Sequence, residues 1–274
     1  MTKRARTSLI LILACMAGLA AAPTRAQFQG QTADDVVQLS FVPGWRLPNG
    51  NHMAGIRITL APGWKTYWRA PGEGGMPTVL HLTEAEGLTG MSIHWPRPDV
   101  FFTNGMRAIG YRNDVVLPVE FALSESGTVE VAGRVEMGVC RDVCMPVTID
   151  LEGLLPPVTE RVREIGMALS DRPLTAAEAG AGHATCAMEP ISDGLRVTVS
   201  VPMPPTGTDE TVVVEHRDPQ IWISEAVTRR EGTTLQGTVD VVPADRGPFA
   251  LNRSDLRITV IGSRMAVELD GCTG

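Results

Sequence analysis

Short segments of alternating polarity, separated by glycine and proline turns, constrain the fold of this chain most. In residues 52–60, Ala54, Ile56, Ile58 and Leu60 occupy alternate positions, with glycine, arginine and threonine between them. This period of two is typical of a strand with one buried face. Similar segments occupy 35–42, 78–82, 114–122, 128–138 and 145–151. Short strands joined by such turns predict an antiparallel β-sandwich over residues 27–155.

The pattern changes after Pro156 and Pro157 and later returns to strands. Apolar residues recur at helical spacing from Val158 to Leu169, which predicts a short helix over 158–170. Six further strand-like segments follow, at 194–202, 211–216, 220–224, 233–242, 256–262 and 264–269. The chain is therefore predicted to be all-β, with a helical linker at 156–182 and a second, smaller sandwich at 183–274.

The N-terminus has the order of a secretory signal. Basic side chains at Lys3, Arg4 and Arg6 precede an apolar run from Leu9 to Ala22, and small residues follow it. That run is too short to span a bilayer as a helix. We predict a signal peptide over residues 1–26, with cleavage after Ala26, and an exported chain that does not insert into the membrane.

Charge excludes some classes of partner. The whole chain has 24 basic and 31 acidic side chains. Removing residues 1–26 takes away four basic side chains and no acidic ones, which leaves 20 against 31 and a net charge of −11. An acidic surface of this size argues against nucleic acid and against anionic membranes as partners.

Cysteine usage points to disulfides. Of the five cysteines, Cys15 lies in the predicted signal, and Cys140, Cys144, Cys186 and Cys272 remain. An even number in an oxidising compartment predicts two disulfides, and four cysteines allow three pairings. Pairing Cys140 with Cys144 and Cys186 with Cys272 is the arrangement that keeps each bridge within one predicted domain.

The two bridges differ in the size of the loop that each would close. On the loop-entropy model, the short Cys140–Cys144 loop contributes roughly 2 kcal/mol and the long Cys186–Cys272 loop roughly 4.5 kcal/mol. That gap corresponds to roughly 50 mV in reduction potential, so Cys140–Cys144 is the easier bridge to reduce. Arg141 would favour a thiolate at Cys140, and Asp142 would oppose it. A purely structural role for this bridge stays open, whereas Cys186–Cys272 is predicted to be structural.

Several separate motifs resemble one family. The segment 62–75 reads PGWKTYWRAPGEGG, 93–98 reads IHWPRP, Gly110-Tyr111 follows, and then Cys140-Arg-Asp-Val-Cys144-Met-Pro146. In this order they resemble the N-terminal periplasmic domain of DsbD/ScsB-type thiol:disulfide interchange proteins, over residues 35–155. A second sandwich after the first is similar to the ScsB arrangement.

The resemblance implies an immunoglobulin-like fold in the periplasm whose Cys140–Cys144 pair relays electrons. It implies a thioredoxin-like domain of a membrane thiol:disulfide reductase as electron donor and oxidised periplasmic thiol proteins as acceptors, which makes the protein a disulfide-reductase-type carrier without a cofactor. We expect the membrane conduit and the thioredoxin-like domain to be separate polypeptides. By the same resemblance, Cys144 forms the mixed disulfide and Cys140 resolves it.

The resemblance also implies an aromatic segment that covers the pair. Trp64–Gly75 is the candidate for that cover or its support, with Trp64, Tyr67 and Trp68 as covering residues and Arg141 as a tuning residue. Core packing of these aromatic residues is the alternative.

Two other hypotheses remain. Met137, Cys140, Cys144 and Met145 offer the soft sulfur ligands that suit Cu(I), and His94 could join them in a copper-tolerance protein. A non-catalytic interaction module with two structural disulfides is the third hypothesis. Motifs of hydrolases, phosphate loops and zinc sites do not occur in the sequence.

Overall fold

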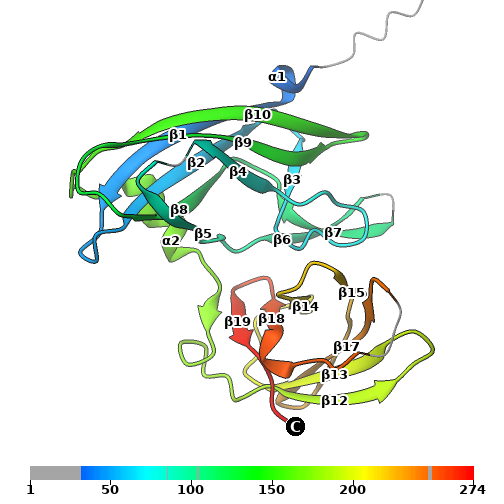
Figure 1. Ribbon diagram of the computed structural model, residues 1–274. Helices are drawn as coiled ribbons and strands as arrows, with labels where there is room; N and C mark the ends of the chain where they lie inside the picture. Colours follow the sequence, from blue (N-terminus) through cyan, green and yellow to red (C-terminus); the bar gives the residue numbers. More distant parts are fainter. Residues whose placement is uncertain (1–31, 85, 104, 246–248) are drawn as a thin grey trace, which may run out of the picture. The chain divides into compact units, whose positions relative to one another are not determined.

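Residues 37–155 fold into two antiparallel sheets that pack face to face (Figure 1). The computed structural model describes residues 32–274 apart from 85, 104 and 246–248. The elements are α1 (Ala33–Val36), β1 (Val37–Arg46), β2 (His52–Leu60), β3 (Lys65–Tyr67), β4 (Val79–Glu84), β5 (Leu88–Ile93), β6 (Asp99–Thr103), β7 (Met106–Tyr111), β8 (Val115–Leu123), β9 (Val129–Cys140) and β10 (Cys144–Leu155). One sheet has the order β1–β2–β8–β5 and the other β10–β9–β3–β7–β6, with β4 also paired to β9. We call this pair of sheets the first sandwich.

The core of the first sandwich is filled from both sheets, because successive side chains of a strand point to opposite faces. On β9, Val131, Val135, Met137 and Val139 point into the space between the sheets and share one apolar cluster with residues of β2 and β8, such as Phe121. The even-numbered residues of β9 lie on the outer face of their sheet. This alternation decides which side chains can meet at the candidate site.

Four strands of the first sandwich, β3, β5, β6 and β7, have no counterpart among the predicted segments. β3 is three residues long, with Thr66 and Tyr67 buried on opposite faces, so it shows no alternation of polarity. It lies within the segment predicted as a covering loop. Neighbouring strands, rather than its own pattern, hold it in the sheet.

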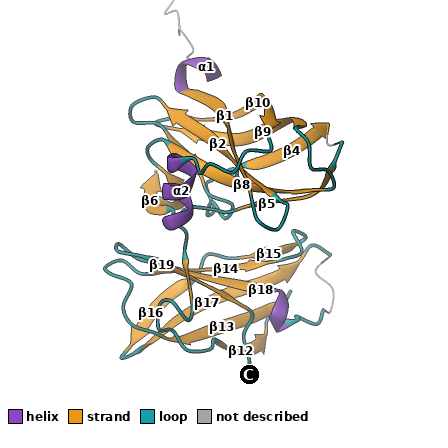
Figure 2. Ribbon diagram, turned by 90° about the vertical axis from the view of Figure 1, so that its left-hand side faces the viewer, coloured by secondary structure: helices purple, strands orange, loops and turns teal. Residues whose placement is uncertain are grey.

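The linker helix is shorter than predicted. α2 (Arg163–Ser170) begins at Arg163 rather than at residue 158. The carbonyl of Val158 accepts a hydrogen bond of 2.6 Å from the backbone nitrogen of Arg46, the last residue of β1. Val158 therefore lies beside the end of β1 and does not start a helical turn. Ile165 then buries the apolar face of α2 against a small cluster that contains Trp45 and Met53, and the helix packs on β8 (Figure 2).

Residues after α2 form two further sheets, which we call the second sandwich. Its elements are β11 (Leu174–Thr175), β12 (Thr185–Pro190), β13 (Leu195–Pro202), β14 (Thr211–His216), β15 (Ile221–Ile223), β16 (Val227–Glu231), β17 (Thr234–Pro243), η1 (Arg253–Asp255), β18 (Leu256–Ile261) and β19 (Ala266–Asp270). The sheets have the orders β11–β19–β18–β14 and β12–β13–β17–β15, with β16 also paired to β17. The prediction of an all-β fold of immunoglobulin-like sandwiches is confirmed.

The predicted linker is partly absorbed into the second sandwich, because β11 pairs in parallel with β19. Residues 32–274 also form a single compact unit. The domain boundaries at 155/156 and 182/183 therefore stay a prediction.

The C-terminus is fastened to the start of the second sandwich. Cys186 and Cys272 form a disulfide with their Cα atoms 5.8 Å apart. Beside it, the backbone nitrogen of Cys186 donates to the carbonyl of Thr273, and the nitrogen of Thr273 donates to the carbonyl of Ala184. Cys186 is buried, at 3% exposure, so this bridge lies among core residues.

The predicted signal peptide, residues 1–26, lies outside the described part of the chain. Within the described part, no helix combines the length and the apolar character that crossing a membrane requires.

Removing each disulfide is expected to affect stability differently. Loop entropy predicts that the variant with Cys186→Ala and Cys272→Ala loses about 4.5 kcal/mol of unfolding free energy, and the variant with Cys140→Ala and Cys144→Ala about 2 kcal/mol. Urea unfolding followed by circular dichroism measures both losses. An equal or greater loss for the Cys140–Cys144 pair would contradict the assignment of Cys186–Cys272 as the stronger staple.

Candidate functional site

The β9–β10 hairpin brings Cys140 and Cys144 together. The two residues are direct register partners at the end of the hairpin, and only residues 141–143 connect them. Their Cα atoms lie 4.1 Å apart and their sulfurs form a disulfide. Facing positions of an antiparallel pair approach to about this distance, so the register of the hairpin itself sets up the bridge.

Strand alternation puts this bridge on the outer face of its sheet. Val139 and Val147 are buried in the core between the sheets, whereas Cys140 belongs to a separate small cluster on the opposite face. Cys144 pairs directly with Cys140 and shares that face. The bridge is thus built on the core-supported hairpin without being part of the main core.

The two sulfurs differ in access. Cys140 is completely buried, at 0% exposure, whereas Cys144 belongs to the exposed class of residues. Thiol–disulfide exchange needs an attacking thiolate to reach one sulfur of the bridge. In this geometry, a second protein reaches Cys144 first.

Tyr67 covers the buried sulfur. Its hydroxyl donates a hydrogen bond of 2.8 Å to Sγ of Cys140 and lies 3.5 Å from Sγ of Cys144. The backbone carbonyl of Tyr67 accepts a 3.0 Å bond from the hydroxyl of Thr78, which fixes the strand end. Burial raises the pKa of Tyr67, so the phenol keeps the proton that it donates.

Two glycines make room for the Tyr67 ring. A Cβ atom on Gly138 would lie 3.0 Å from the ring, and one on Gly75 would lie 2.7 Å from it. Contacts this close leave no space for a side chain at either position. The ring therefore lies in a slot between β9 and the returning segment 71–76, with its hydroxyl directed at the bridge.

An apolar wall and cationic side chains complete the surroundings. Phe101 and Ala108 cluster with Tyr67 and Cys140 on the outer face. Lys65 Nζ lies 4.9 Å and Arg112 Cζ lies 5.0 Å from the centre of the Phe101 ring. Lys65 is also the register partner of Cys140 across β3 and β9. Positive charge near the bridge favours a thiolate when the bridge opens.

The other predicted covering residues lie elsewhere. Trp64 and Trp68 are buried in the core between the two sheets, at 4% and 0% exposure, so they support the site from behind. Arg141 extends back over the Trp64 ring, 5.4 Å from its centre, and pairs with Asp142 at 3.1 Å. The tuning role of Arg141 stays a prediction.

The ligands suggested for Cu(I) do not converge. Met137 is fully buried in the main core, and its sulfur accepts a 3.6 Å contact from the hydroxyl of Thr66. Met145 is partly buried and packs against that same core, on the face opposite the cysteines. His94 lies next to Glu120, 3.1 Å from Nε2 to Oε2. In the described part of the chain, no group of three or more histidine, cysteine or acidic residues is arranged to hold a metal ion.

Sequence reasoning missed several residues of the site. Phe101 and Ala108 have no local signal, because they join Cys140 only through the folding of segments distant in sequence. Gly138 and Thr78 contact Tyr67 rather than the bridge, and no local pattern marks those contacts. Gly75 was visible as part of a glycine-rich turn, but its role in accommodating Tyr67 was not. The one available signal was the placement of Tyr67 between Trp64 and Trp68, which marked this segment as part of the site.

Residues 29–156 match the family model of the thiol:disulfide interchange protein DsbD, N-terminal. No curated protein matches the chain. Among solved structures, the chain is similar to the N-terminal periplasmic domain of ScsB from Proteus mirabilis, with 22% identity and a TM-score of 0.65, covering 89% of this chain and 97% of that chain.

Selective alkylation tests the difference in access between the two sulfurs. After mild reduction of the folded protein, we expect iodoacetamide to modify Cys144 at least about tenfold faster than Cys140, because exposure governs thiol reactivity. Peptide mass mapping at short reaction times measures the ratio, and the same reaction in urea serves as the control. Equal rates in the folded protein would contradict the access difference.

Proposed function

We propose, from the match of residues 29–156 to the DsbD N-terminal family model, that the protein carries electrons between thiol proteins in the periplasm through Cys140 and Cys144. The family supports a thiol:disulfide interchange type of function. The proposed donor is a thioredoxin-like domain of a membrane reductase, and the proposed acceptors are oxidised periplasmic proteins.

One observation carries the proposal. The bridge joins an exposed residue, Cys144, to a fully buried one, Cys140, whose sulfur already accepts a hydrogen bond from Tyr67. This asymmetry gives the two cysteines different tasks. Cys144 forms the mixed disulfide with the partner. Cys140 is the leaving group when the bridge opens and the resolving thiol when it closes.

Electrons enter by attack at Cys144. A partner thiolate attacks Sγ of Cys144, a new intermolecular S–S bond forms, and the Cys140–Cys144 bond breaks with its electron pair on Cys140. A second thiolate of the partner then attacks the partner's own sulfur in the mixed disulfide and releases Cys144 as a thiolate. Two electrons have moved to this protein, the partner holds a disulfide, and protons are exchanged with water.

Electrons leave by the reverse sequence. The Cys144 thiolate attacks the disulfide of an oxidised protein and expels one of its thiolates. The neighbouring Cys140 thiolate then attacks Sγ of Cys144, which restores the bridge and releases the second thiolate of the substrate, now fully reduced.

Tyr67 assists at the step where charge develops. When the bridge opens, negative charge appears on Sγ of Cys140, which has no access to water. The phenol hydroxyl, 2.8 Å away, is positioned to donate to that charge. The raised pKa of Tyr67 keeps the donor protonated throughout the neutral range.

The Cu(I) alternative is not favoured, because the methionine sulfurs lie on the opposite face of the hairpin from the cysteines. The interaction-module alternative requires a bridge that does not open in the folded protein. Titration against glutathione buffers, with alkylation and mass spectrometry, separates it from the carrier. We expect Cys140–Cys144 to open while Cys186–Cys272 stays closed, because loop entropy alone separates their potentials by roughly 50 mV. A Cys140–Cys144 bridge that stays closed in strongly reducing buffer would overturn the proposal.

Loss of the Tyr67 hydroxyl is expected to slow exchange. A hydrogen bond to a charged group contributes about 1.5–3 kcal/mol, so Tyr67→Phe should lower the rate constant for bridge reduction by glutathione about 10- to 100-fold. Reactions are stopped with acid at set times and the free thiols are then alkylated, which gives the rate constant for reduction of the bridge. Thr89→Val, which removes a hydroxyl remote from the bridge, is the control. An unchanged rate in Tyr67→Phe would exclude the assisting role.

Serine variants separate the two cysteine roles. In Cys140→Ser, the mixed disulfide with a partner cannot be resolved internally and should accumulate at Cys144. In Cys144→Ser, the remaining thiol is buried and should form little mixed disulfide. Incubation with oxidised glutathione followed by intact mass measurement gives both amounts, and a greater amount in Cys144→Ser would reverse the assignment.

A further inference from the structure

The second sandwich directs three carboxylates at the segment that encloses Tyr67. Glu215 on β14, Glu225 after β15 and Glu268 on β19 all pair with groups of the first sandwich. These residues lie outside the part of the chain that matches the family model. Their targets, Arg69 and Arg107, belong to the elements around the redox bridge.

Arg69 is the most heavily engaged of these targets. Its guanidinium donates to both oxygens of Glu215, at 2.9–3.2 Å, and to Glu268 at 2.5 Å. It also stacks on the ring of Trp68, 4.0 Å from the ring centre. Burial disfavours its charge, but the carboxylates of Glu215 and Glu268 more than offset this effect, so the pKa of Arg69 is raised. Because its side chain is only 14% exposed, loss of both carboxylates would leave a largely buried charge without compensation.

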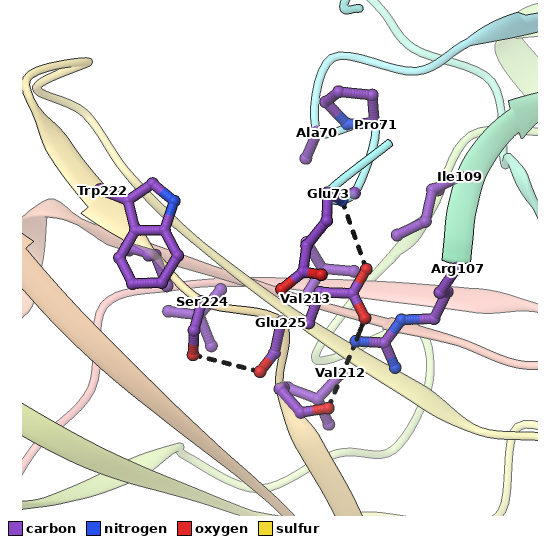
Figure 3. A pocket seen from close by; sticks show the side chains of 14 residues that line it. Ala70, Pro71, Glu73, Arg107, Ile109, Val212, Val213, Trp222, Ser224 and Glu225 are labelled. Carbon is purple, nitrogen blue, oxygen red and sulfur yellow. Dashed lines mark hydrogen bonds and ion pairs between the residues drawn. The ribbon is translucent and has the colours of Figure 1, made fainter. Parts of the chain in front are cut away.

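Glu225 holds the far side of the same segment. One of its oxygens accepts from the backbone nitrogen of Glu73 at 3.3 Å, and the other pairs with Arg107 at 3.1 Å (Figure 3). Arg107 in turn donates to the carbonyl of Ala226. These contacts line a cavity of about 260 Å³ whose wall includes Ala70, Pro71 and Gly72.

The anchored segment is the one that forms the Tyr67 slot. Arg69 follows Tyr67 by two residues, and Glu73 precedes the Gly74–Gly75 turn that lies against the Tyr67 ring. Backbone bonds between Ile109 and the pair Trp68 and Pro71 hold the side that faces β7. The carboxylates of the second sandwich hold this segment at two points, at Arg69 and at the backbone nitrogen of Glu73.

We propose that Glu215, Glu268 and Glu225 are positioning residues for the redox site, through which the second sandwich keeps the Tyr67 hydroxyl on Cys140. This inference rests on the proposed function, because it assigns the contacts a role in the exchange reaction. The three carboxylates touch neither sulfur and act through the segment 69–75. The role differs from simple attachment of the two sandwiches, since its effect must pass through Tyr67.

A double-mutant cycle tests the proposal. Reduced glutathione is the probe, and the rate constant for opening Cys140–Cys144 in the full chain is the readout. Removal of the Tyr67 hydrogen bond should slow the reaction about tenfold or more. Glu215→Gln combined with Glu268→Gln should slow it about 3- to 10-fold in the presence of Tyr67, and less than about twofold in the Tyr67→Phe background, because coupled residues are non-additive.

Matched controls keep the test specific. Glu210→Gln removes a carboxylate from a comparable, partly buried arginine pair with Arg230 within the second sandwich, and should leave the rate unchanged. Circular dichroism verifies folding of each variant. If the double glutamine variant does not fold, Glu225→Gln, which removes the charge that pairs with Arg107, replaces it in the cycle with the same expected pattern.

The outcomes separate the inference from the proposed function. Equal slowing by the glutamine variants with and without Tyr67, or no slowing at all, would overturn the positioning role and leave the carrier function standing. A wild-type bridge that glutathione cannot open would overturn both. Slowing that depends on Tyr67, with no effect of Glu210→Gln, supports the proposal.

Discussion

The register of the β9–β10 hairpin is the constraint on which the candidate site depends. Pairing Cys140 with Cys144 makes the bridge, and the parity of the strand positions puts it on the outer face of the sheet. A shift by one residue would turn every side chain of a strand to the other face, because the strand period is two. Val139 and Val147 in the core hold the register, so the same apolar packing that stabilises the first sandwich keeps both cysteines on the outer face of the sheet.

The two disulfides of this chain have different surroundings, which suit the different roles that we propose for them. Cys186–Cys272 closes a long loop among core residues and fastens the C-terminus. Cys140–Cys144 has only residues 141–143 between its cysteines and leaves Cys144 exposed. A bridge that constrains little of the unfolded chain contributes little to stability, so the proposed opening of Cys140–Cys144 costs the first sandwich little of its stability. Opening the bridge moves charge to the buried sulfur, where Tyr67 already supplies a donor.

The sequence allowed the architecture to be predicted further than the site. Period-two segments such as 52–60 identify strands, because their alternation reflects one buried face. β3 and the Tyr67 slot were beyond this reasoning, since a three-residue strand buried on both faces has no pattern and the slot depends on Gly138, a residue of another strand. The copper hypothesis grouped Met137 with Cys140 because both offer soft sulfur ligands, but strand parity places the two side chains on opposite faces of the sheet.

The second sandwich gains significance from the same geometry. Trp68 fixes the start of the segment in the main core, whereas residues 71–75 run beside the Tyr67 ring on the outer face of the sheet. This outer part needs anchors that are directional and that leave Cys144 exposed. Carboxylates that pair with Arg69 and Arg107 meet both needs, since charge-assisted hydrogen bonds fix orientation over a small contact area. In the positioning role that we propose, the second sandwich thus acts on the bridge of the first sandwich through Arg69 and Arg107, without any of its three carboxylates touching the sulfurs.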